Sequence, residues 1–188
     1  MSPLEILSNE HGLIRQFLDN LALAVEKLED EQRPPTEFFE KAVRFARTFA
    51  DSFHHIKEEY VMFVRLAQKK GGAIDAHIEA LRHQHERARN YTAAITEALP
   101  GYDSGQPFQV SQVLESAAAY VSLLRNHIHK EDHIFFPMVR EVLSEDEEQQ
   151  LLVEFNKARE KARNETGEDA FESAHKLVVD MGSALVHM

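Results

Sequence analysis

Long stretches of this chain contain neither glycine nor proline, and within them apolar residues return every three or four positions. That spacing places the apolar side chains on one face of an α-helix. The 7 glycines and 6 prolines gather mostly in a few short segments, which interrupt the pattern. The sequence therefore predicts an all-α protein built from long amphipathic helices.

Six helices are expected between the interrupting segments. Four long ones cover about residues 3–29, 37–69, 74–99 and 108–143. Thr36 is the expected N-cap of the second helix, and Gly71-Gly72 and Pro100-Gly101 are expected to end the second and third. A fifth helix follows the Ser-x-x-Glu capping box at 144–147, and a sixth covers about 169–187.

Long helices with short connections predict an up-down-up-down four-helix bundle. We expect one domain over residues 1–188, with the core bundle at about 3–143 and two additional C-terminal helices at about 144–188. A weak internal repeat supports two similar helix pairs, because the segment 53–59 resembles the segment 126–132.

Composition excludes several classes of protein. The formal net charge of −11 disfavours nucleic acid and anionic membrane surfaces as partners. Without cysteine, the chain cannot form disulfides, Cys-ligated iron–sulfur clusters or a covalent c-type haem attachment. No segment resembles a secretory signal or a membrane span, so a cytoplasmic location is the default expectation.

Histidines interrupt the apolar faces of the first four helices. In the helix at 108–143, for example, His127 and Glu131 continue the apolar stripe that contains Leu124 and Phe135. On two helices a glutamate follows the histidine by four positions, which is one helical turn. The inward-facing polar residues are predicted to be His11, His54, Glu58, His85, His127 and Glu131.

The other histidines fall mainly on polar faces. The helical phase places His55, His83, His129 and His133 on solvated stripes, and it leaves open whether His77 or His175 contributes to a site. A single histidine in an apolar stripe is more often a hydrogen-bonded core residue than a ligand. Four such interruptions on four helices, two with a glutamate one turn away, favour a metal site. Two buried glutamates could each bridge two metal ions, which would also offset the cost of burying their charge.

These residues resemble the hemerythrin-like, HHE cation-binding family. The matching motifs are Asn9–His11, His54–Glu59, His85–Arg89 and His127–Asp132, within about residues 3–160. The resemblance implies a four-helix bundle around a non-haem di-iron centre, with two Fe ions held by the six residues named above. The chain departs from the oxygen-carrying branch, which has a second histidine where this chain has Leu81. It also lacks the cysteine segment common in the iron-centre repair branch.

The resemblance implies a di-iron protein that binds or reacts with oxygen, nitric oxide or hydrogen peroxide, for example in oxidative or nitrosative stress defence. An alternative is a non-catalytic oxygen or iron sensor or binding protein, and a third is a bundle whose metal is purely structural. Whether the chain is an enzyme stays open from the sequence, as does its oligomeric state.

Overall fold

The computed structural model describes residues 1–69, 72 and 74–186, and within these residues it contains helices and no β-strand. The helical segments follow each other in this order: α1 (Pro3–Glu29), α2 (Thr36–Phe45), η1 (Ala46–His55), η2 (Lys57–Met62), α3 (Phe63–Leu66), α4 (Asp75–Asp103), α5 (Pro107–Lys130), η3 (Glu131–Phe135), α6 (Phe136–Val142), α7 (Glu145–Thr166) and α8 (Ala170–Val186).

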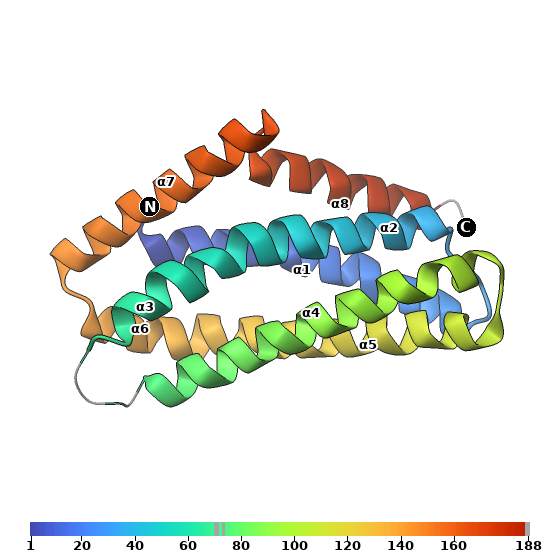
Figure 1. Ribbon diagram of the computed structural model, residues 1–188, viewed down its shortest axis with the longest axis horizontal. Helices are drawn as coiled ribbons and strands as arrows, with labels where there is room; N and C mark the ends of the chain where they lie inside the picture. The colour runs from blue at the N-terminus through green and yellow to red at the C-terminus, as the bar shows by residue number, and fades with distance from the viewer. Residues whose placement is uncertain (70–71, 73, 187–188) are drawn as a thin grey trace.

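Several of these segments join into continuous helical rods. One rod runs from α2 through η1 and η2 to α3, and another runs from α5 through η3 to α6 (Figure 1). These two rods lie alongside α1 and α4: α4 packs against α5 and α2, and α1 packs against α5. Helices α7 and α8 lie on the outside, where α8 contacts α1 and α2 and α7 contacts η2 (Figure 1).

The segments η1, η2 and η3 are π-helical, with hydrogen bonds from residue i to i+5 instead of i+4. They interrupt the second and fourth predicted helices, which were expected to keep one α-helical phase. A π-helical stretch has more residues per turn, so side chains on it turn by a smaller angle from one residue to the next. His55 in η1 therefore faces inward instead of outward, whereas His54 and Glu58 keep their predicted inward direction.

Some predicted helix ends shift. Thr36 begins α2 instead of capping it, and its hydroxyl donates to Asp103 at 2.7 Å. The α-helix α3 ends at Leu66, and the predicted terminator Gly71 lies outside the described residues, as does His187, the predicted end of the last helix. Helix α4 continues through Pro100 to Asp103, because a proline removes only one donor and the turn beyond it is held by the buried Tyr102.

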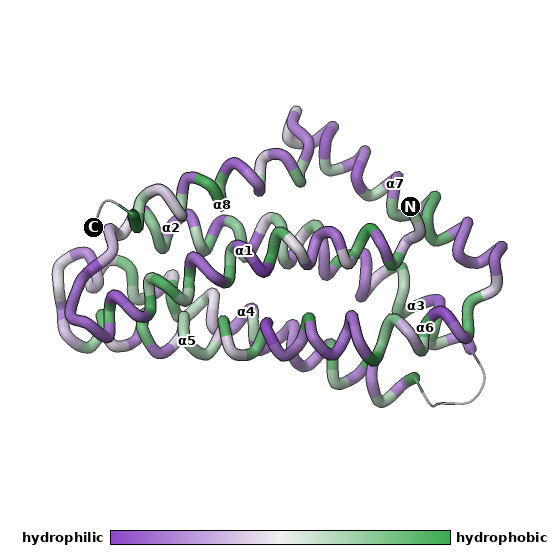
Figure 2. Tube along the Cα trace, turned by 180° about the vertical axis from the view of Figure 1, so that it is seen from behind, coloured by the Kyte–Doolittle hydropathy of each residue, from purple (hydrophilic) through white to green (hydrophobic). Residues whose placement is uncertain are grey.

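The capping box of α7 is confirmed. Ser144 accepts a hydrogen bond from the Glu147 backbone, and the Glu147 side chain accepts from the Ser144 backbone at 2.8 Å. Gly167 ends this helix in the left-handed conformation, with φ of 77°. Helix α7 is largely hydrophilic (Figure 2) and buries only Leu151 and Phe155. It therefore packs against the rest of the protein through a narrow apolar stripe.

The apolar core is divided into two clusters. One contains Leu13, Phe17 and Phe45, and the other contains Leu4, Phe63 and Phe135. His11 separates the residues that α1 contributes to each, and it lies in a layer of buried polar side chains between the two clusters. The packing of apolar side chains above and below thus encloses a polar layer in the interior.

Candidate metal centre

The six residues predicted to face inward meet in this polar layer, and all are buried. They come from six helical segments: α1 supplies His11, η1 His54, η2 Glu58, α4 His85, α5 His127 and η3 Glu131. The side chains form two groups that share glutamates.

The first group lies between α1 and the rod that runs from α2 to α3, with Glu131 added from η3. The Nε2 atoms of His11 and His54 are 3.1 Å apart. Glu58 Oε1 lies 3.4 Å from His54 Nε2, and Glu131 Oε2 lies 3.2 Å from His11 Nε2. Two imidazole nitrogens and two carboxylates therefore converge on one small volume.

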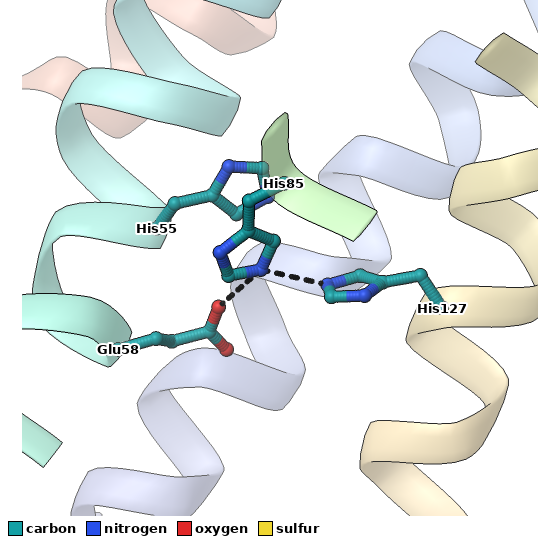
Figure 3. A group of neighbouring side chains, drawn as sticks. All are labelled: His55, Glu58, His85 and His127. Carbon is teal, nitrogen blue, oxygen red and sulfur yellow. Dashed lines mark hydrogen bonds and ion pairs between the residues drawn. The ribbon is translucent and has the colours of Figure 1, made fainter. Parts of the chain in front are cut away.

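The second group lies between α4 and α5. The Nε2 atoms of His85 and His127 are also 3.1 Å apart, and Glu58 Oε2 lies 3.4 Å from His85 Nε2 (Figure 3). Glu131 Oε2 lies 3.1 Å from His127 Nε2. Each glutamate thus contacts one histidine in each group, and Glu58 presents a different oxygen to each side.

The outer nitrogen of each of these histidines contacts an oxygen acceptor. The Nδ1 distances are 2.9 Å from His11 to Asp132, 2.8 Å from His54 to Glu10, 2.6 Å from His85 to Glu59 and 2.8 Å from His127 to Gln84. Because such an oxygen can only accept, the Nδ1 proton is directed outward and the neutral ring points its Nε2 lone pair inward. Metal-binding histidines are usually oriented by partners of this kind.

Three of the acceptors are themselves paired with cations. Asp132 pairs with Arg15, Glu10 with Lys57 and Glu59 with Arg89. These pairs stabilise the ionised carboxylates, and contacts with His85 and Arg89 lower the pKa of Glu59 to about 2 against the opposing effect of burial.

The inner carboxylates lack such partners. All four oxygens of Glu58 and Glu131 are buried and have no hydrogen-bond partner within the part of the chain that the structure describes. Burial and the neighbouring Glu131 raise the pKa of Glu58 to about 7. Against the effect of burial, the hydrogen bond to Asp132 and the adjacent Glu131 carboxylate raise the pKa of His11 to about 10. The layer therefore requires positive charge, which a bound metal ion would supply, and the residues present fit such an ion.

Comparison with known sequences is consistent with this chemistry. The profile described as hemerythrin HHE cation binding domain matches residues 2–139. The chain belongs to the hemerythrin family. It is also 27% identical over 184 residues to uncharacterized proteins of Mycobacterium bovis and Mycobacterium tuberculosis, covering 96% of this chain and 69% of each relative. No solved structure matches the chain significantly.

Domains of the hemerythrin family bind metal cations, and the buried histidine and glutamate groups of this chain are suited to hold a metal. The matched segment ends within α6, so α7 and α8 lie beyond it. Among the described residues, no helix is long and apolar enough to cross a membrane.

The prediction of a solvated His55 was wrong. This side chain is 2% exposed, and its ring stacks on that of His85 with 3.8 Å between ring centroids (Figure 3). It lies with Glu58, His85 and His127 in one of the two groups of potential metal ligands. The cause is the π-helical geometry of η1, which turns two consecutive histidines, His54 and His55, into the interior.

The remaining histidines agree better with the predicted phase. His83, His129 and His133 are exposed, as expected from their polar stripes. Of the two that the sequence left open, His77 is partly buried and His175 is exposed.

Sequence reasoning missed the acceptors that orient the histidines. Each acceptor is adjacent in sequence to a predicted inward residue and contacts a histidine of another helical segment. Glu10 next to His11 contacts His54, for example, and Gln84 next to His85 contacts His127. The sequence does show a polar residue beside four of the predicted ligands. Each of these residues, however, contacts a histidine on a different helix, and these contacts can be seen only in the folded structure.

Proposed function

We propose that this protein is a non-haem di-iron protein that binds or reacts with oxygen, nitric oxide or hydrogen peroxide. Its architecture would be an up-down-up-down four-helix bundle of hemerythrin type, extended by α7 and α8 within one domain. The observation that carries the proposal is the sharing of Glu58 and Glu131 between two pairs of histidines.

The proposed ligands are the six predicted residues. His11 and His54 would hold one ion, His85 and His127 the other, and Glu58 and Glu131 would bridge both. Mixed nitrogen and oxygen donors suit iron, manganese or zinc, and the family resemblance favours iron. Six protein ligands shared by two ions leave coordination positions open, which distinguishes a reactive centre from a closed structural one.

The surrounding residues would restrict what reaches the centre. The ring of Phe136 stacks on that of His11 at 5.6 Å, and the ring of Phe63 stacks on that of His85 at 6.2 Å. Leu7 and Leu81 are buried in the apolar cluster that contains Phe63. These side chains exclude bulk water and favour small, weakly polar molecules. Iron held there would supply one-electron redox chemistry and open positions for a diatomic molecule or peroxide.

Stopped-flow spectroscopy of the iron-loaded protein tests this proposal. We expect the reduced protein to oxidise quickly in air, because Leu81 replaces a fifth histidine and leaves room for an exogenous ligand. We also expect it to consume hydrogen peroxide faster than its His127→Ala variant. A stable, reversible oxygen complex without peroxide turnover would instead support an oxygen carrier or sensor. An iron spectrum insensitive to oxygen, nitric oxide and peroxide would support a purely structural metal.

A further inference from the structure

A cavity lies between the bundle and the C-terminal helices. It has a volume of about 630 Å³ and is bounded by α1, η1 and η2 on one side and by α7 and α8 on the other. Its apolar wall consists of Ile6, Phe53, Leu152, Phe155 and Phe171. Cavities of this size, with mostly apolar walls and a few polar groups, are typical binding sites for small organic molecules.

Two buried charged side chains line this cavity. Lys57 and Glu10 form an ion pair with side-chain exposures of 1% and 5%, and the ammonium group also lies 3.7 Å from the centroid of the Phe53 ring. Burying a lysine is costly, so such a residue is rarely found without a partner or a function. The ammonium has three N–H donors, and Glu10 accepts from one of them.

Arg159 adds a second cation to the cavity wall. Its side chain is 59% exposed and pairs with Asp169 on the outside of the protein. The cavity therefore has two cationic side chains and one carboxylate, Glu10, among its lining residues. Each cation has one carboxylate partner, Glu10 for Lys57 and Asp169 for Arg159, and an anion in the cavity would share both cations with these partners.

The cavity is also connected to the candidate metal centre. Glu10 accepts from Lys57 through Oε1 and contacts His54 Nδ1 through Oε2 at 2.8 Å. The Glu10 carboxylate thus contacts both Lys57, which lines the cavity, and His54, which lies in the polar layer. A molecule placed at Lys57 would lie one side chain away from His54.

We propose that this cavity binds a small organic monoanion with an aromatic or aliphatic body, such as an aryl carboxylate. The carboxylate would pair with Lys57 and Arg159, and the body would pack against Phe53, Phe155 and Phe171. This site is distinct from the metal centre. Because its walls include α7 and α8, it depends on a part of the chain beyond the segment that matches the hemerythrin family.

Isothermal titration of the purified, metal-containing protein with 1-naphthoate tests the proposal. The expected dissociation constant is below about 1 mM. The uncharged analogue 1-naphthalenemethanol should bind at least about tenfold more weakly, because it cannot pair with the two cations. Absence of naphthoate binding, or equally tight binding of the alcohol, would overturn the proposal. Either result is independent of which metal the protein holds.

Two pairs of variants locate the site. Leu152→Trp should fill the cavity and weaken naphthoate binding at least about tenfold, whereas Val153→Trp, on the exposed side of the same helix, should leave it unchanged. Arg159→Gln should weaken binding, and Arg163→Gln, an exposed arginine outside this cavity, should not. These positions avoid the buried Lys57, whose replacement could unfold the protein. Equal affinities within either pair would contradict the proposed location.

Discussion

The orientation of the imidazole rings decides what the inner layer of this protein can bind. Each of the four outer nitrogens has an oxygen acceptor, and the inner nitrogens meet in pairs 3.1 Å apart. Glu58 and Glu131 add carboxylate oxygens that have no hydrogen-bond partner among the described residues. Lone pairs that converge in this way repel one another, and a cation between them removes the repulsion.

Removing one inner histidine should therefore have two effects. We expect His54→Ala and His127→Ala to lose metal and to lower the free energy of unfolding by about 3–5 kcal/mol, because a buried carboxylate loses its partner. His129→Ala, one turn from the same region but exposed, should change stability by less than about 0.5 kcal/mol. Metal analysis and urea denaturation measure both quantities. Equal metal loss in all three variants would show that the inward and outward assignment is wrong.

A separate prediction concerns the buried ring of His55. Its ring stacks on that of His85, and its Nδ1 lies 3.4 Å from Asp51, a longer contact than those of the other inner histidines. We expect His55→Ala to lose metal to a chelator at least about tenfold faster than the unchanged protein, as is usual when a metal-site neighbour is removed. His83→Ala, exposed on α4, is the control. If His55→Ala retains metal as well as this control, the buried ring serves packing alone.

Helical phase was sufficient to find the six inward residues, because each interrupts an apolar stripe at the spacing of a regular helix. The acceptors Glu10, Glu59 and Gln84 could not be found in the same way. Their contacts cross from one helix to another and depend on how the helices are rotated in the fold. His55 was misplaced because the phase was counted with α-helical turns through a segment that is π-helical.

At the scale of the elements, the π-helical segments coincide with the candidate centre. His54 and His55 lie in η1, Glu58 in η2 and Glu131 in η3. π-Helical segments are rare in proteins overall, and those that occur are often found at functional sites. The sequences of η1, η2 and η3 carry no glycine or proline that would predict a change of helix type, so these segments could not be predicted from the sequence. Pro100, in contrast, suggested a helix end where α4 continues.

The capping box of α7 allows a stability prediction for one element. Ser144→Ala should lower the free energy of unfolding by about 1 kcal/mol, because the backbone N–H of Glu147 loses its acceptor. Ser183→Ala is a matched control, since that exposed hydroxyl bonds, among the described residues, the carbonyl of Val179 within α8. Thermal or urea denaturation measures the difference. Equal stability of the two variants would indicate that α7 frays without affecting the rest of the fold.

At the scale of the whole molecule, the polar layer divides the apolar core into two clusters. Amphipathic periodicity predicted the long helices and the C-terminal pair, because it depends only on residue order. The position of α7 and α8 over η2, α1 and α2 depends on contacts far apart in the sequence, and periodicity does not specify these. A metal ion that binds the polar layer of the folded protein, and not the unfolded chain, should raise the free energy of unfolding of the entire protein.

Elemental analysis tests whether two metal ions bind between the shared glutamates Glu58 and Glu131. After expression in iron-replete medium and removal of loosely bound metal, we expect about two iron ions per chain. A variant carrying both Glu58→Ala and Glu131→Ala should retain far less than the unchanged protein. Absence of transition metal, under conditions that saturate a known di-iron protein, would contradict the account.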